Sequence, residues 1–90
     1  MRRCHIIVKG LVQGVCFRYY TQAQAQRLGL NGWVRNRPDG AVEIMAEGDT
    51  ASIDKLTEWS KSGPPQAEVA ELISEDMKYT GELIGFDITY

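Results

Sequence analysis

The chain has 90 residues, of which 43% are hydrophobic and 24% are charged, and its formal net charge is −2. This length predicts one domain over residues 1–90 with one modest hydrophobic core. The weakly acidic balance gives no electrostatic reason to bind nucleic acid or an anionic membrane, so neither is expected as a partner.

The two cysteines, Cys4 and Cys16, match no zinc or redox spacing. The strand expected between them would span roughly 23 Å, whereas bridged Cα atoms lie within about 7 Å. Reduced thiols are therefore expected, as in a cytoplasmic protein.

The N-terminal segment of the chain is basic and then apolar, but Lys9 and Gly10 interrupt its apolar run too early for a signal peptide. A monomer is the default expectation at this size.

The first third of the chain predicts a strand, a loop and a helix. Residues 4–9, "CHIIVK", are typical of a strand, and residues 17–29 of a helix that follows a glycine-rich loop. Gly29 is the expected C-terminal stop. The helix is expected to bury the residues that fall on one side of it at helical spacing, namely Phe17, Thr21, Ala25 and Leu28.

The middle of the chain predicts a hairpin. Two short strands, residues 32–37 and 41–48, are joined across "PDG", which is a strong turn signal. In the second strand, Val42, Ile44 and Ala46 alternate with Glu43 and Glu47. This alternation predicts one buried face and one face that is exposed to water.

The last part of the chain predicts a second helix and two strands. Asp49 can cap a helix over residues 50–61, with Ile53, Leu56, Trp59 and Ser60 facing inward, and "SGPP" ends it. Residues 67–76 and 86–90 are the remaining expected strands.

The resulting order is βαββαβ with a short C-terminal strand. We expect an α+β fold, a ferredoxin-like split βαβ sandwich in which an antiparallel sheet carries both helices on one face. Right-handed crossovers place the first and third strands at the centre of the sheet.

The loop "GLVQGVCFR", residues 10–18, joins the first strand to the first helix. The first amides of a helix have no internal partners, and the helix dipole adds partial positive charge there. Gly14 permits a positive φ, and Arg18 supplies a planar fork of donors. These features predict a pocket for a phosphate-sized anion. The alternative is a tight turn with a surface arginine. No Walker motif is present, so a nucleotide site is not supported.

Three blocks of sequence resemble the acylphosphatase family: "GLVQGVCFR", "LGLNGWVRN" and "DGAVE". "GPPQAEV" and "FDITY" fit the family's tail, so the resemblance covers essentially the whole chain. Position 16 is Cys where Gly or an aromatic residue is expected, and position 37 is Arg where some members have Thr. Neither departure removes a catalytic residue of the family.

The resemblance implies hydrolysis of an acyl phosphate, a small carboxyl–phosphate anhydride, without a metal or another cofactor. It implies that Arg18 binds the substrate phosphate and that Asn36 positions the attacking water. The loop amides that would help to bind the phosphate belong to Gly14, Val15, Cys16, Phe17 and Arg18.

The residue inventory suits this chemistry. The only histidine, His5, is expected to be a partly buried strand residue, and a catalytic triad or a histidine metal cluster is not supported. Cys16 is interpreted as a packing residue, since the C-x5-R spacing of a phosphocysteine mechanism is absent. The leaving carboxylate, whose conjugate acid has a pKa of roughly 4, needs no protein acid.

Two other functions stay open at this stage. One is a non-catalytic module on the same scaffold that binds phosphate or carbamoyl phosphate, although a chain that stops at Tyr90 favours the free-standing enzyme. The other is RNA binding, because RNA-recognition domains share the βαββαβ order. Those domains place aromatic residues on the two central strands, and residues 4–9 and 41–48 contain none.

Overall fold

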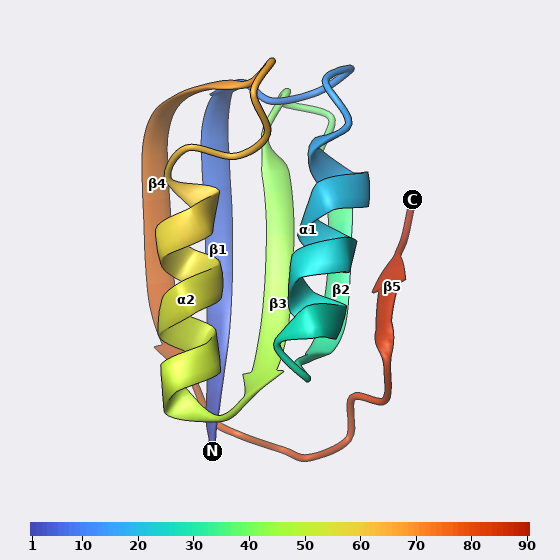
Figure 1. The fold of residues 1–90 in the computed structure, drawn as a ribbon, viewed down its shortest axis with the longest axis vertical. Coiled ribbons are helices and arrows are strands. Elements are labelled where there is room, and N and C mark those ends of the chain that lie inside the picture. Colours follow the sequence, from blue (N-terminus) through green and yellow to red (C-terminus); the bar gives the residue numbers. More distant parts are fainter.

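The computed structural model describes residues 1–90 and confirms the predicted fold class. Two helices lie side by side on one face of a five-stranded sheet (Figure 1). The elements in chain order are β1 (Arg2–Leu11), α1 (Phe17–Arg27), β2 (Asn31–Asn36), β3 (Val42–Gly48), α2 (Thr50–Ser60), β4 (Glu68–Met77) and β5 (Phe86–Ile88).

The strands are arranged in the order β4-β1-β3-β2-β5, so the first and third strands lie at the centre as predicted. The pairs β1–β3, β1–β4 and β2–β3 are antiparallel. The short strand β5 instead pairs parallel with β2, and the sheet is therefore mixed rather than wholly antiparallel. The reason is visible in Figure 1: the chain leaves β4 at the end of the sheet where β2 begins, crosses to the far edge and returns in the direction of β2.

The core lies between the sheet and the helices, where the apolar face of the strands meets the apolar faces of the two helices. Alternate residues of β1 and β3 point to the helix side, as period-two patterning requires. They meet the buried positions of α1 and α2, where every predicted inward residue is fully or partly buried. The buried cluster contains Cys4, Ile6, Val8, Val12, Phe17, Ala25, Leu30, Val34, Val42, Ile44, Ala46, Ile53, Leu56 and Phe86.

The helix ends follow the capping residues of the sequence. At the start of α2, the carboxylate of Asp49 accepts a hydrogen bond of 3.2 Å from the backbone N–H of Ala51. Helix α1 ends at Arg27 with Leu28 as its C-cap, and Gly29 follows with φ 71°, the left-handed conformation of a glycine stop. Neither helix is long and apolar enough to cross a membrane.

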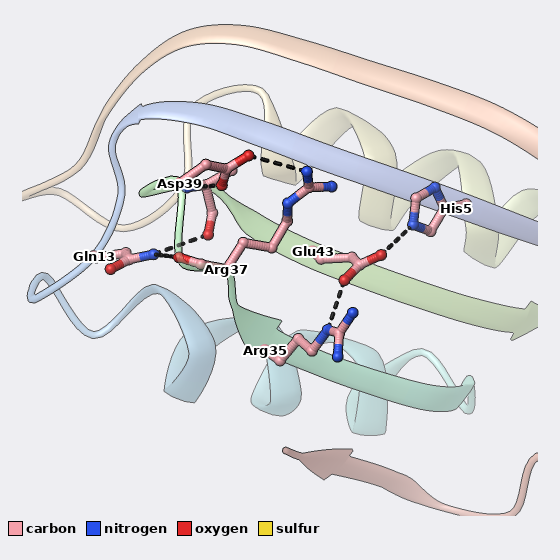
Figure 2. A network of polar contacts seen from close by, with 7 residues as sticks. His5, Gln13, Arg35, Arg37, Asp39 and Glu43 are labelled. Carbon is pink, nitrogen blue, oxygen red and sulfur yellow. Dashed lines mark hydrogen bonds and ion pairs between the residues drawn. The ribbon is translucent and has the colours of Figure 1, made fainter. Parts of the chain in front are cut away.

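The prediction that one face of β3 is exposed to water is wrong. Glu43 and Glu47 lie on the face away from the helices, yet they are only 8% and 2% exposed. Neighbouring strands cover Glu43: its carboxylate accepts hydrogen bonds of 2.6 Å from both His5 and Arg35, which lie on either side of it in Figure 2. Alternation within one strand does not reveal this cover, because it comes from side chains on β1 and β2.

Glu47 is covered by the loop that leads to β5. The backbone N–H and the hydroxyl of Thr80 donate to its Oε2 at 2.9 and 3.0 Å, and the N–H of Gly81 donates to Oε1 at 3.2 Å. Arg3 adds an ion pair of 3.1 Å. Burial raises the pKa of Glu47, but the donors from Thr80 and Arg3 outweigh it and hold this pKa below its ordinary value. One carboxylate therefore fastens the β4–β5 loop to the sheet.

Replacing Glu47 by Gln should destabilise the protein at neutral pH and reduce its sensitivity to acid. The folded-state pKa is lowered, so the carboxylate's stabilisation is complete above about pH 5 and is lost as pH falls through the folded value. We expect Glu47→Gln to lower the free energy of unfolding by about 1–3 kcal/mol at pH 7. At pH 3 the difference from the wild type should be smaller. Urea unfolding at both pH values measures it.

Glu71→Gln is the matched control, because Glu71 is exposed on β4 and forms no ion pair in the structure. This variant should follow the wild-type dependence on pH. The interpretation of Glu47 fails if Glu47→Gln differs from the wild type by the same free energy at both pH values.

Candidate active site

The loop between β1 and α1 takes its shape from two left-handed residues. Gly14 has φ 75° and Cys16 has φ 63°, and Cys16 is the only residue other than glycine with a positive φ. A left-handed backbone costs a residue with a Cβ roughly 1–2 kcal/mol. Successive N–H groups in such a turn point toward one concavity, which is the geometry that binds anions.

The backbone amides at the start of α1 are unpaired. No N–H from Gly14 to Tyr19 donates a backbone or side-chain hydrogen bond, and the first internal bond runs from Tyr20 N–H to Cys16 O at 3.1 Å. The N-cap residue, Cys16, provides no side-chain cap, and the first turn has no acidic residue. The same fold caps α2 with Asp49. The positive end of α1 is thus left uncompensated.

Arg18 lies in the first turn of this helix. Its guanidinium forms no ion pair and no hydrogen bond, and its one aromatic contact places Cζ 5.2 Å from the centre of the Tyr90 ring. Arg18 is half-buried. The five N–H donors of the planar guanidinium are therefore available to an anion beside the free amides.

Asn36 is the last residue of β2 and is also half-buried. Its Oδ1 is the only buried side-chain polar atom in the structure without a hydrogen-bond partner. Such an unsatisfied oxygen costs about 1–3 kcal/mol. An orphaned acceptor of this kind marks a place where a ligand or a water donor would be stabilised.

The structure brings five of the six predicted site residues together around one open pocket of about 370 Å³. The exception is Val15, whose side chain packs against the core and lines a neighbouring pocket instead. The lining residues are Val12, Gly14, Cys16, Phe17, Arg18, Tyr19, Asn36, Ile88 and Tyr90. The volume is within the range of small-molecule sites.

The C-terminal segment lines one side of the pocket, which no local sequence pattern predicted. Ile88 and Tyr90 line the pocket beside Arg18, because β5 pairs with β2 and its chain continues toward the start of α1 (Figure 1). These residues lie about seventy positions from the loop, and no local pattern places them there. Tyr19, by contrast, adjoins Arg18 in the sequence and could have been found.

Cys16 is not the packing residue that was predicted. It is an exposed free thiol, and it lines the pocket from its left-handed position outside the core.

His5 is half-buried and hydrogen-bonded to Glu43, in agreement with the structural role expected for it. Arg35 pairs with Glu43 and Arg37 with Asp39 at 3.0 Å, and neither arginine lines the pocket.

Comparisons with known proteins identify the family of this chain. A family model described as Acylphosphatase matches residues 4–88. An acylphosphatase from Acaryochloris marina (strain MBIC 11017) is 55% identical over 82 residues, which are 91% of this chain and 87% of that protein. The chain belongs to the acylphosphatase family.

The crystal structure of an acylphosphatase from Bacillus subtilis matches at a TM-score of 0.96 with 40% identity, and the match covers 100% of each chain. The predicted family, fold and enzyme class, a hydrolase of acyl phosphates, are thereby confirmed. The acylphosphatase fold also occurs inside larger proteins. The crystal structure of full-length HypF in the phosphate- and nucleotide-bound form matches at a TM-score of 0.86 and 26% identity, over 99% of this chain and 12% of that one.

The left-handed backbone of Cys16 predicts how a glycine at this position changes the stability of this acylphosphatase. Cys16→Gly relieves roughly 1–2 kcal/mol of backbone strain but adds about 0.4–1 kcal/mol of chain entropy in the unfolded state. The free energy of unfolding should stay unchanged or rise by up to about 1.6 kcal/mol. The same substitution at the exposed helical residue Ala23 should lower it by about 1 kcal/mol. Urea unfolding compares the two, and equal losses would show that Cys16 carries no strain.

Proposed function

We propose that this acylphosphatase hydrolyses its substrate by direct attack of water, with Arg18 and the loop amides holding the phosphate and Asn36 positioning the water. The observation that carries the proposal is a convergence. The pocket is lined by Arg18 with its unpaired guanidinium, by loop residues with unpaired amides, and by Asn36, whose buried Oδ1 has no hydrogen-bond partner. Each group lacks what a bound phosphate or a water would supply.

Phosphate binding combines positive charge with hydrogen-bond donors that are directed at the phosphate oxygens. The amides from Gly14 to Tyr19 carry the positive end of α1, and Arg18 adds a full positive charge with a planar set of donors. The transition state of phosphoryl transfer is loose and spreads negative charge over the equatorial oxygens. Donors that are already aimed at those oxygens stabilise the transition state without reorganisation.

Asn36 suits the positioning of water because its amide group carries both kinds of hydrogen-bonding atom. The side-chain oxygen accepts a hydrogen bond from water, while the NH2 group donates to water or to phosphate. Asn also brings no negative charge that would repel the substrate, as an aspartate would. Holding the water in line with the scissile bond converts a bimolecular attack into an effectively unimolecular one.

The reaction needs no protein acid. The water oxygen bonds to phosphorus, the bond from phosphorus to the acyl oxygen breaks, and its electron pair leaves on the carboxylate. The water's proton passes to a phosphate oxygen, so the products are a carboxylate and inorganic phosphate. A carboxylate is a stable leaving group at neutral pH. The chain also has no group of three His, Cys, Asp or Glu residues arranged to hold a metal ion, and we propose that activity persists in EDTA.

Hydrolysis of benzoyl phosphate in the presence of EDTA tests this mechanism. Arg18→Ala should lower kcat/KM by about 10²–10³-fold and weaken competitive inhibition by inorganic phosphate. Asn36→Ala should lower kcat by about 10²-fold or more, with the inhibition constant of phosphate nearly unchanged, because its contact is made mainly in the transition state. Kinetics of the wild type and both variants give these values.

Two controls separate the mechanism from general damage. Arg27→Ala removes an exposed positive charge from the last turn of α1 and should leave the kinetics unchanged. Asn31→Ala removes the acceptor of a hydrogen bond from Gly85 at the other end of β2 and should affect stability rather than kcat. Wild-type protein that binds phosphate but does not hydrolyse benzoyl phosphate would instead favour a binding module. Activity that EDTA abolishes and a divalent ion restores would contradict the metal-free mechanism.

A further inference from the structure

Gln13 connects two parts of the pocket that are otherwise contributed by different segments of the chain. Its side-chain Nε2 donates to the backbone oxygen of Arg37 at 2.8 Å and to that of Ala41 at 3.0 Å. Figure 2 shows this side chain reaching from the β1–α1 loop to the β2–β3 turn. Both hydrogens of one amide nitrogen are thus used to hold the turn.

The turn that Gln13 holds is a closed unit. Arg37 N–H donates to Ala41 O at 2.8 Å, and Gly40 N–H donates to Arg37 O at 3.1 Å. Asp39 accepts a hydrogen bond of 3.0 Å from Ala41 N–H and pairs with Arg37 (Figure 2). A closed turn moves as one body, and Asn36 is the residue immediately before it. Fixing the carbonyl of Arg37 therefore fixes the end of the strand that carries Asn36.

The phosphate-binding part of the pocket is anchored separately. Phe17 is buried in the core and packs against Trp59 with ring centres 5.5 Å apart, which fixes the start of α1. The loop amides and Arg18 follow that helix. The side chains of Arg18 and Asn36 form no hydrogen bond with each other, and the Gln13 amide joins the β1–α1 loop directly to the β2–β3 turn.

We propose that Gln13 is a positioning residue, which sets the place of Asn36 relative to the phosphate loop through the β2–β3 turn. This inference rests on the proposed roles of Asn36 and the loop. A shift of about 1 Å in a catalytic group costs up to about 10²-fold in rate.

The test is a double-mutant cycle with Gln13→Met, which keeps the length of the side chain and removes the donor. Gln13→Met should lower kcat for benzoyl phosphate by about 10–100-fold, while the inhibition constant of inorganic phosphate changes less than about 3-fold. In the Asn36→Ala background the same substitution should cost less than about 3-fold, because the group that it positions is already gone. Gln26→Met, at an exposed residue of α1 whose side chain forms no hydrogen bond, is the control and should leave kcat unchanged.

A purely structural role for Gln13 would give equal losses of kcat in both backgrounds or a parallel loss of phosphate affinity, and either result overturns the proposal. A second readout does not depend on activity. In the Gln13→Met variant, the side-chain NH2 signals of Asn36 should shift in the NMR spectrum. The hydrogen-bonded amides of the turn, those of Arg37, Gly40 and Ala41, should exchange faster, while amides 17–20 stay unchanged. Inactive wild-type protein would refute the proposed function alone, whereas unchanged Asn36 signals would refute the role of Gln13.

Discussion

The site depends on one unusual feature, a helix that starts without a cap. Every α-helix leaves its first amides without internal partners, and a polar or acidic side chain normally satisfies some of them. Helix α2 follows this rule through the side chain of Asp49, whereas Cys16, the N-cap residue of α1, provides no side-chain cap. The amides from Gly14 to Tyr19 are therefore free to serve an anion, and Arg18 stands in the same turn.

The rest of the fold holds other groups against this helix start. The parallel strand β5 brings Ile88 to the pocket, and its lead-in loop is fastened to the sheet by the buried carboxylate of Glu47. The strand β2 ends in Asn36 at the same pocket. In the proposed mechanism, the sheet acts as a rigid frame that fixes where the phosphate and the water meet, which is the main requirement for a reaction with a good leaving group.

Much of the fold could be predicted from spacing alone. Apolar residues at period two or at helical spacing identified every strand and helix to within about two residues at most ends, and Gly29 and Asp49 correctly marked a stop and a cap. The loop with Gly14 and Arg18 was recognisable because each residue has a local physical reason to be there. The assignment of Asn36 to a role in catalysis came from the family resemblance and not from spacing.

What the sequence did not reveal depends on residues that are far apart. Glu47 was predicted to be exposed to solvent. It is buried because Thr80 and Gly81, which lie more than thirty positions later in the chain, pack over it. The parallel pairing of β5 is set by the path of a loop and not by its own three residues. The partners of Gln13 lie 24 and 28 positions away, so nothing in the motif itself indicates them.

The central claim is that the uncapped start of α1 binds the phosphate group, and an NMR titration with inorganic phosphate tests it directly. In spectra of ¹⁵N-labelled protein, the amide signals of residues 14–19 should shift together along one saturating curve. The amides at the capped start of α2, residues 50–53, should not move. Phosphate that shifts both helix starts to the same small extent, or that leaves residues 14–19 unchanged, would contradict the account.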